Sequence, residues 1–412
     1  MDDVQNWKLK LFSDQELCYA DIIPPSQVRA RIEVSVLNFI KILNAPKPAI
    51  SHLPLIKRNL SNSRVNHGLL TELSCVFLSH SVSTRSLMKP NAAKAFVRGT
   101  YNFITYILLQ LHLFNFHCNL SRAVWKVMEM CYQILLQEKC VTQRELYYKL
   151  LCDSPHLFPS QTDVNRTIQD VVALLRCSRF SLGIIASSRG LIAGRIILQE
   201  PGKEDVDCSM CGSSGHTISG DFNLLQKLSL YSDARYIIIV EKHAIFQRLT
   251  EDQFFHQIPS ILITAKGYPD MATRYYAHQF LVHRISRIFP DLPILCLVDW
   301  NPAGLAILCT FKFGSIGMGL EAYRYACNVK WLGLRGHDLD MVPDQSLVPL
   351  KPKDLQIAES LISSGILQEN YKEEVALMVR SGRRAEIEAL YFHGYDYLGK
   401  YIAKKIVQSD YI

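Results

Sequence analysis

The run Thr142-Gln-Arg-Glu-Leu-Tyr-Tyr-Lys149 places two adjacent tyrosines and an arginine at the start of a short predicted helix. Thr142 and Glu145 have the T-x-x-E spacing of a capping box, which marks a helix N-terminus. Tyr148 follows Arg144 by four residues, so their side chains are neighbours on one face of the helix. An arginine there can bind a phosphate and favour the phenolate, whose ordinary pKa is about 10. The oxygen of Tyr148 could then attack a phosphodiester and keep one DNA end covalently attached.

The adjacent Tyr147 has a different predicted role. It falls on the apolar face of the same helix, together with Leu146, Leu150 and Leu151, so we interpret it as a packing residue. Packing is also the alternative for Tyr148, because a tyrosine on a helix is usually structural.

Two acidic residues follow predicted strands farther along the chain. Glu241 comes directly after the apolar run 235–240, and Asp299 comes directly after the run 293–298. Ligands bind at the carboxyl ends of the strands in an open parallel sheet. Two carboxylates at such an edge would hold Mg²⁺, which prefers oxygen ligands and keeps several waters. The alternative is that each acid merely caps the helix that follows it.

Three further residues are candidates for contacts with DNA. Arg189 lies in the predicted turn Ser187-Ser-Arg-Gly190, where it could touch the DNA backbone. Lys266 and Tyr268 lie in the polar loop 264–270, which follows a strand at the edge expected to carry Glu241. Ordinary solvated turns and loops would explain all three residues as well.

Cysteine usage adds little chemistry. Cys208 and Cys211, followed by His216, begin like a zinc site, but no second pair completes four ligands nearby. The 12 cysteines form no disulfide framework, which favours reduced thiols in a nuclear or cytosolic protein. The start of the chain does not resemble a signal peptide. The chain also has no Walker-type loop, so we do not expect it to hydrolyse ATP.

The composition is that of a folded protein with a polyanionic partner. The 412 residues suffice for two or three domains, and 49% are hydrophobic. The formal net charge of +7 suits DNA without proving it. The longest apolar stretch, 103–116, is too short to span a membrane and predicts a core helix instead.

The elements around the tyrosines predict a winged-helix domain. Helical periodicity covers 121–137 and 162–175, and the segment 182–198 has the pattern of two strands joined by a tight turn. Three helices followed by a hairpin form a winged helix, whose helix-turn-helix can enter a major groove. This arrangement would put Arg189 at the tip of the wing.

An amphipathic helix is predicted at 26–43, which could pack on the chain's own core or dock on a partner. The segment 44–90 is rich in proline, asparagine and serine and is typical of a linker or a loosely packed arm.

The later part of the chain alternates strands and helices. Apolar strands are predicted at 235–240, 260–264, 293–298 and 329–334, with helices at 271–289 and 302–313 and from 353 onward. Uninterrupted apolar strands separated by helices indicate a mostly parallel sheet covered on both faces. The prediction is therefore an α/β multidomain protein with an N-terminal arm (1–92), a winged-helix domain (93–200), a linker (201–224) and an α/β domain with C-terminal helices (225–412).

Over residues 95–412 the chain resembles the meiotic double-strand-break transesterases, eukaryotic relatives of the A subunit of topoisomerase VI, a type IIB topoisomerase. Seven blocks in the family's order carry this resemblance: Arg144-Glu-Leu-Tyr-Tyr148, Ser188-Arg-Gly-Leu191, Val240-Glu-Lys-His243, Lys266-Gly-Tyr-Pro-Asp270, Asp299-Trp-Asn-Pro-Ala-Gly304, Trp331-Leu-Gly-Leu334 and Arg384-Ala-Glu-Ile-Glu-Ala-Leu390.

The resemblance implies a winged-helix domain followed by a Toprim domain. The family's nucleophile falls on Tyr148 with Arg144 as its partner, and its Toprim acids fall on Glu241 and Asp299. The family further implies Mg²⁺, a nuclear location, and a dimer, either of two copies or with a paralogue, in which each member of the pair attacks one strand of double-stranded DNA. A partner resembling the topoisomerase VI B subunit is expected, and the product would carry protein on both 5′ ends and initiate meiotic recombination.

The chain departs from the family's pattern at one metal position. The usual Asp-x-Asp is Asp299-Trp-Asn301 here, and Asn301 can offer a carbonyl oxygen but no negative charge. Arg189 also stands where relatives commonly have lysine. Asn301 favours an alternative function, a winged-helix scaffold of the break machinery that binds DNA without cleaving it. A Toprim primase or nuclease is a more distant alternative, since neither would need the tyrosine.

Overall fold

The computed structural model describes residues 17–18, 20–43, 55–56, 63–67, 74–79, 84–85, 119–185, 187, 189–275, 277, 292–314, 320–321 and 326–412. The chain forms two compact units, which we describe separately. The first comprises Met1–Arg64, Val76–Ala186 and Ser315–Ala322; the second comprises Val65–Cys75, Ser187–Gly314 and Tyr323–Ile412.

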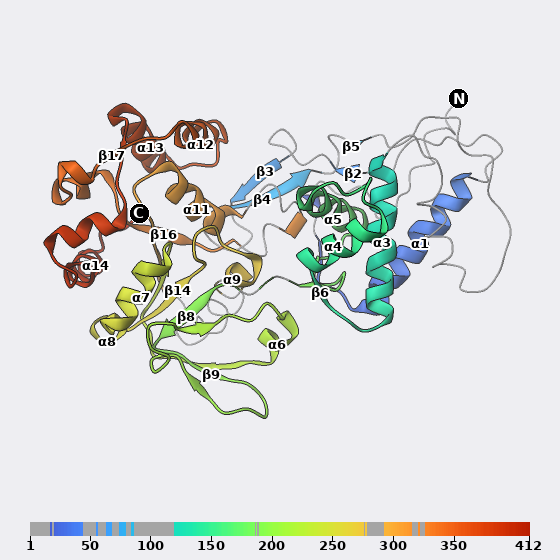
Figure 1. Cartoon of the computed structure of the whole chain (residues 1–412), viewed down its shortest axis with the longest axis horizontal. Helices are drawn as coiled ribbons and strands as arrows, with labels where there is room; N and C mark the ends of the chain where they lie inside the picture. The colour runs from blue at the N-terminus through green and yellow to red at the C-terminus, as the bar shows by residue number, and fades with distance from the viewer. Residues whose placement is uncertain are drawn as a thin grey trace. The chain divides into compact units, whose positions relative to one another are not determined.

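Three helices form the centre of the first unit: α3 (Asn119–Leu136), α4 (Gln143–Asp153) and α5 (Gln161–Leu175) (Figure 1). The apolar stripes of α3 and α5 are buried in one shared core, as their 3.6-residue periodicity predicts. The capping box at the start of α4 is confirmed. The hydroxyl of Thr142 accepts the Glu145 N–H at 3.1 Å, and the Glu145 carboxylate accepts the Thr142 N–H at 3.1 Å.

Helix α1 (Pro25–Leu43) packs on this same core. Val28, Ile32 and Val36 on its apolar face are completely buried. The guanidinium of Arg31 donates to the carbonyls of Leu175 and Arg176 at the end of α5, at 2.9 Å each, where a positive charge is favoured. Of the two alternatives for this helix, the apolar face therefore serves the chain's own core.

The described parts of the predicted arm contain strands. β1 (Leu17–Cys18), β4 (Ser74–Ser79) and β3 (Ser63–His67) form a sheet in that order, and β2 (Leu55–Ile56) pairs with β5 (Thr84–Arg85). The core helix predicted at 103–116 lies outside the described residues. None of the helices within the described ranges is long and apolar enough to cross a membrane.

A six-stranded sheet is the centre of the second unit, in the order β11-β8-β14-β13-β15-β16. Its four parallel strands confirm the sequence prediction to within one residue at either end: β13 (Tyr236–Val240), β14 (Ser260–Thr264), β15 (Ile294–Leu297) and β16 (Val329–Gly333). Nearly every side chain in them is buried, which explains why they lack polar alternation.

Helices accompany this sheet. α7 (His243–Glu251) and α8 (Phe254–Gln257) pack on β14, α11 (Pro302–Phe313) packs on β16, and α12 (Pro352–Ser363), α13 (Glu369–Ser381) and α14 (Tyr397–Val407) complete the unit. Of the helix predicted at 271–289, only α9 (Met271–Tyr275) is described as an α-helix.

The predicted wing hairpin at 182–198 was wrong. Its first strand, β7 (Ile184–Ile185), pairs in parallel with β6 (Val141–Thr142) in the first unit. Its second strand, β8 (Leu191–Gly194), lies in the second unit between β11 and β14 and is antiparallel to both. All four residues of β8 are buried, as expected of an interior strand and not of an exposed wing.

The predicted linker 201–224 is folded as well. β10 (Val206–Asp207), β9 (Ile197–Gln199) and β12 (Ser229–Tyr231) form a small antiparallel sheet in that order. β11 (His216–Thr217) extends the main sheet, and α6 (Phe222–Lys227) follows. The domain limits inferred from the sequence remain a prediction, and the compact units exchange segments after residues 64, 75, 186, 314 and 322.

Candidate active site

The arginine–tyrosine pair of the first unit lies on the exposed face of α4. Leu146 and Leu150 are buried on the opposite face, so the helix turns Tyr148 outward, with its side chain 51% exposed. The guanidinium carbon of Arg144 lies 5.9 Å from the centre of the Tyr148 ring. A hydrogen bond with Tyr148 raises the pKa of Arg144. Tyr147 packs against the core, as predicted.

The acidic residues of the second unit lie where the sheet reverses its strand order. The chain passes from β13 to β14 on one side and then returns to β15 on the other side of β13. A crevice forms at such a switch point, at the carboxyl ends of the strands. Glu241 directly follows β13, and Asp299 lies two residues beyond β15. The structure therefore brings these two predicted site residues together.

The backbone of this turn fixes both acids. The N–H of Asp299 donates to the Glu241 carboxylate at 2.9 Å, and the Asp299 carboxylate accepts the N–H of Ile387 at 2.9 Å. Burial, followed by the nearby charge of Glu241, raises the pKa of Asp299 to about 8. Burial also raises the pKa of Glu241. Two buried carboxylates in one turn favour a nearby cation, because burial and the neighbouring negative charge both disfavour their ionised forms.

Neither acid caps a helix through its side chain. The N-cap of α7 is Lys242, which makes no side-chain capping bond. The N-cap of α11 is Asn301, whose side-chain oxygen accepts the N–H of Gly304 at 2.7 Å. The capping alternative therefore fails for both acids, while Asn301 has a structural role in addition to the metal role predicted for it.

Gly304 allows the close packing of this turn. A Cβ atom at this position would lie 2.5 Å from the carbonyl oxygen of Asp299 and 3.2 Å from a carboxylate oxygen of Glu241. Only glycine lets helix α11 approach the acids this closely.

Two further glutamates, which sequence reasoning missed as site residues, complete the group. Trp300 and Ala385 exchange backbone hydrogen bonds at 3.0 and 3.1 Å, so the segment after Ala385 runs beside Asp299. Carboxylate oxygens of Asp299, Glu386 and Glu388 lie within 4.8 Å of one another. The signal was the Glu-x-Glu spacing in the block 384–390, where Glu386 is the N-cap of a 3-10 helix (Ile387–His393) and Glu388 lies in its first turn.

Lys242 connects these carboxylates. Its Nζ atom lies 3.0 Å from Asp299 and 2.5 Å from both Glu386 and Glu388. Burial works against its charge, but Asp299 and the two glutamates raise the pKa of Lys242 above its ordinary value. An all-oxygen donor set that already surrounds a positive charge fits Mg²⁺.

The three predicted DNA contacts lie in this unit and near the same edge. Leu191 at the start of β8 pairs with Thr264 at the end of β14, so Arg189 and Lys266 each lie two residues beyond the same end of this strand pair. Both are exposed, and Tyr268 is 55% exposed. The loop is tied to the site because the N–H of Gly267 donates to the carbonyl of Glu241 at 2.9 Å. Burial and the charge of Glu241 raise the pKa of Tyr268.

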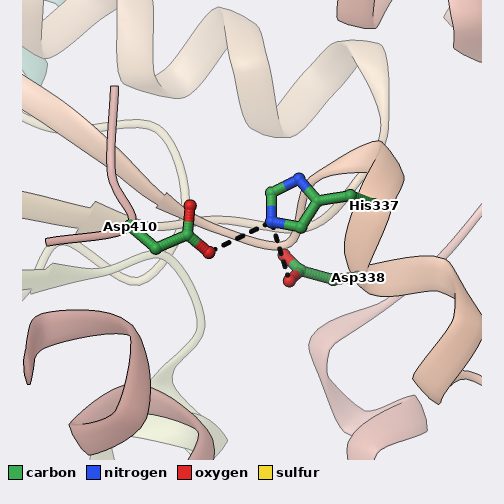
Figure 2. A group of neighbouring side chains, drawn as sticks. All are labelled: His337, Asp338 and Asp410. Carbon is green, nitrogen blue, oxygen red and sulfur yellow. Dashed lines mark hydrogen bonds and ion pairs between the residues drawn. The ribbon is translucent and has the colours of Figure 1, made fainter. Parts of the chain in front are cut away.

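A second acidic group, shown in Figure 2, consists of His337, Asp338 and Asp410. The ring nitrogen Nε2 of His337 faces both carboxylates, at 3.4 Å from Asp338 and 3.1 Å from Asp410. The Lys405 ammonium binds Asp338 at 2.8 Å and Asp410 at 3.1 Å, and Arg335 also pairs with Asp410. Two cations already balance the two acids, so we interpret this group as a structural ion-pair network.

The possible zinc ligands do not assemble. Within the described ranges, Cys208, Cys211 and His216 are not among the groups of three or more side chains that are close enough to share a metal ion. Burial raises the pKa of the Cys208 thiol, which disfavours the thiolate that zinc needs.

In comparisons with known proteins, each of the two units contains a segment that matches a protein-family model. Residues 236–406 match the family model for the Toprim domain of Spo11 and the topoisomerase 6 A subunit. Residues 122–184 match the family model described as "Type IIB DNA topoisomerase".

Whole-chain relatives extend this match. The chain is 67% identical over 404 residues to meiotic recombination protein SPO11-2 of Arabidopsis thaliana, covering 98% of both chains. It is 36% identical over 296 residues to human meiotic recombination protein SPO11, covering 70% of this chain and 72% of the relative. It is 34% identical over 293 residues to the A subunit of DNA topoisomerase 6 from Arabidopsis thaliana, covering 70% and 66%. The chain therefore belongs to the family of Spo11 proteins and topoisomerase VI A subunits.

Proposed function

We propose that this protein cleaves both strands of DNA by tyrosine transesterification and thereby initiates meiotic recombination. The observation that carries the proposal is the exposed hydroxyl-bearing side chain of Tyr148 beside the Arg144 guanidinium on a firmly capped helix. The relatives named as meiotic recombination proteins support the biological setting.

The reaction is a single displacement at phosphorus. The Tyr148 oxygen loses its proton to solvent and forms a bond to phosphorus, while the bond from phosphorus to the 3′ oxygen breaks. The 3′ oxygen takes up a proton and leaves as a hydroxyl, and the 5′ end stays on the tyrosine. Arg144 would donate charge-assisted hydrogen bonds to the phosphate and hold it beside the Tyr148 oxygen.

The acidic edge of the second unit is the proposed metal site. Glu241 and Asp299 would hold Mg²⁺, with Asn301 as a further oxygen donor. A bound Mg²⁺ would stabilise the charge that develops on the leaving 3′ oxygen. Arg189, Lys266 and Tyr268 would contact the DNA near this edge, chiefly through the backbone.

A double-strand break requires two attacks, and each chain offers one such tyrosine. We therefore infer a pair of catalytic chains, either two copies of this chain or this chain with a paralogue, and a partner resembling the topoisomerase VI B subunit. Cleavage of chromosomal DNA in meiosis would require the protein to be in the nucleus.

The second candidate function is a DNA-binding scaffold that does not cleave. One observation favours it: Asn301 brings no charge to the metal site and already caps α11. The protein would then act only through its partners in the break machinery.

The test is an immunoprecipitation under denaturing conditions from meiotic cells, followed by detection of covalently attached DNA. Tyr147→Phe is the matched control, because it removes the adjacent hydroxyl while keeping the packed ring. We expect adducts from the wild type and from Tyr147→Phe, and none from Tyr148→Phe. Adducts that survive Tyr148→Phe would refute the assigned nucleophile, and a wild type that forms no adducts would favour the scaffold.

A further inference from the structure

Lys242 has an unusual position at the acidic edge. It follows Glu241 and is the N-cap residue of α7, yet its side chain forms no capping bond to that helix. Its side chain is 24% exposed and reaches into the carboxylate group, where its ammonium contacts Asp299, Glu386 and Glu388. At these three distances of 2.5–3.0 Å the ammonium competes directly with any second cation for the same oxygens.

The charges explain why a cation lies there. Glu241 and Asp299 come from the sheet, and Glu386 and Glu388 come from the segment that pairs with Trp300. Carboxylate oxygens of Asp299, Glu386 and Glu388 lie within 4.8 Å of one another, so these three groups repel one another strongly unless a positive charge or protons compensate them. Among the described residues, Lys242 is the cation that contacts three of the four carboxylates.

We propose that Lys242 is the built-in counter-ion of the metal site, which the metal must displace, and that Glu386 and Glu388 are oxygen ligands of that metal. The inference rests on the metal site of the proposed function and adds to it a competition between ammonium and metal. The two glutamates also supply the negative charge that Asn301 lacks. The site is then held together without metal, and it binds metal more weakly than its four acids alone would.

The test measures metal binding directly on the purified full chain, using Mn²⁺ as the probe and its electron paramagnetic resonance signal as the readout. Lys242→Met removes the ammonium and keeps an unbranched side chain of about the length of the lysine's carbon stem. We expect it to bind Mn²⁺ about tenfold more tightly than the wild type, the scale of effect seen when a residue beside a metal site is changed. We also expect a lower thermal unfolding midpoint without metal and a larger rise on adding Mg²⁺.

Two control variants make the result specific. Lys203→Met removes an exposed lysine that is paired with Glu200 at 2.8 Å, and it should leave Mn²⁺ binding unchanged. Lys242→Arg keeps the charge, so its Mn²⁺ affinity should stay near that of the wild type or below it. If Lys242→Met binds Mn²⁺ no more tightly than the wild type, Lys242 is not a competitor and the proposal fails.

Glu388→Gln tests whether Glu388 is a ligand of the metal. It also keeps the proposal testable if Lys242→Met does not fold. We expect it to bind Mn²⁺ about tenfold more weakly, and an unchanged affinity would overturn the assignment of Glu388. DNA adducts are scored separately through Tyr148. If the wild type forms DNA adducts but Lys242→Met binds Mn²⁺ as the wild type does, only the inference about Lys242 is rejected. If Lys242→Met changes Mn²⁺ binding as expected but the wild type forms no DNA adducts, only the cleavage function is rejected.

Discussion

Leu191 pairs with Thr264 across the antiparallel strands β8 and β14. The start of one strand therefore meets the carboxyl end of the other, and the residues just outside this pair leave the sheet at the edge that carries Glu241. Arg189 was expected at the tip of a wing beside the tyrosine helix. It belongs instead to the unit with the acids, which also contains Lys266 and Tyr268, so this unit combines exposed basic residues with the proposed metal site.

From the exposed charges of Arg189 and Lys266 we predict a salt-dependent contribution to DNA binding. Arg189→Ala and Lys266→Ala should each weaken binding to duplex DNA and lower the slope of log affinity against log salt by about 0.9, the value for one phosphate contact. Titrations of labelled duplex at several salt concentrations measure both quantities. Lys203→Ala, at an exposed ion pair in the turn between β9 and β10, should change neither. Unchanged slopes in the two variants would show that these residues do not touch phosphates.

Arg144 should affect cleavage without affecting stability. It is exposed and contacts Tyr148, so Arg144→Ala should leave the thermal unfolding midpoint nearly unchanged. The variant would lose the charge-assisted hydrogen bonds to the phosphate, so adduct formation should slow by about 10- to 100-fold. Arg144→Lys keeps the charge without the two-pronged geometry and should recover only part of the rate. A normal rate in Arg144→Ala would exclude its role beside the nucleophile.

Gly304 predicts a local steric effect. In Gly304→Ala the new methyl group would meet the carbonyl oxygen of Asp299, so the turn that holds the acids must shift, at a cost of about 1–3 kcal/mol. Both the unfolding free energy and Mg²⁺ binding should fall. Gly399→Ala is the matched control, because its Cβ in helix α14 meets only Phe254 at 3.5 Å. That change should stabilise the helix by about 0.5–1 kcal/mol. Equal effects of the two substitutions would contradict the close approach at Gly304.

Local patterns in the sequence predicted the features that depend on neighbouring residues. The apolar runs gave the four parallel strands, and the spacing of Thr142 and Glu145 gave the start of α4. The order of strands and helices also placed Glu241 and Asp299 at one edge, because parallel strands end on the same side. These features follow from periodicity and chirality and need no knowledge of distant contacts.

Long-range pairing explains what the sequence could not predict. The segment 182–198 has the pattern of a hairpin. β8 pairs with β14 instead, because burial of the side chains on both faces of β8 stabilises that pairing. Glu386 and Glu388 reach the site through long-range contacts: Trp300 pairs with Ala385, and Ile387, 88 residues from Asp299 in the chain, donates its N–H to the Asp299 side chain. No spacing rule connects residues so far apart. The sequence therefore showed Glu386 and Glu388 only as part of the block 384–390, without a predicted role.

The ion-pair network around Asp338 should respond to mutation unlike a metal site. Lys405→Met leaves the buried Asp338 without its ammonium partner and should lower the unfolding free energy by about 3–5 kcal/mol. Lys404→Met, at the exposed neighbouring position of α14, should have little effect. Thermal unfolding with and without Mg²⁺ measures both. A Mg²⁺-dependent recovery of Lys405→Met would contradict the structural role and indicate a second metal site.

Asn301 offers a way to separate capping from metal binding at one residue. Its side-chain oxygen accepts the Gly304 N–H, and aspartate caps helices as well as asparagine does, so Asn301→Asp should preserve α11. The added charge should tighten Mn²⁺ binding by about tenfold if this side chain faces the ion. Asn301→Ala should lose the cap, at about 1 kcal/mol of stability. Spin-resonance titration and thermal unfolding of both variants distinguish the two roles. An affinity that Asn301→Asp leaves unchanged would place this side chain outside the metal's coordination sphere, because an extra negative charge in direct contact with a divalent cation cannot leave its binding free energy unaltered.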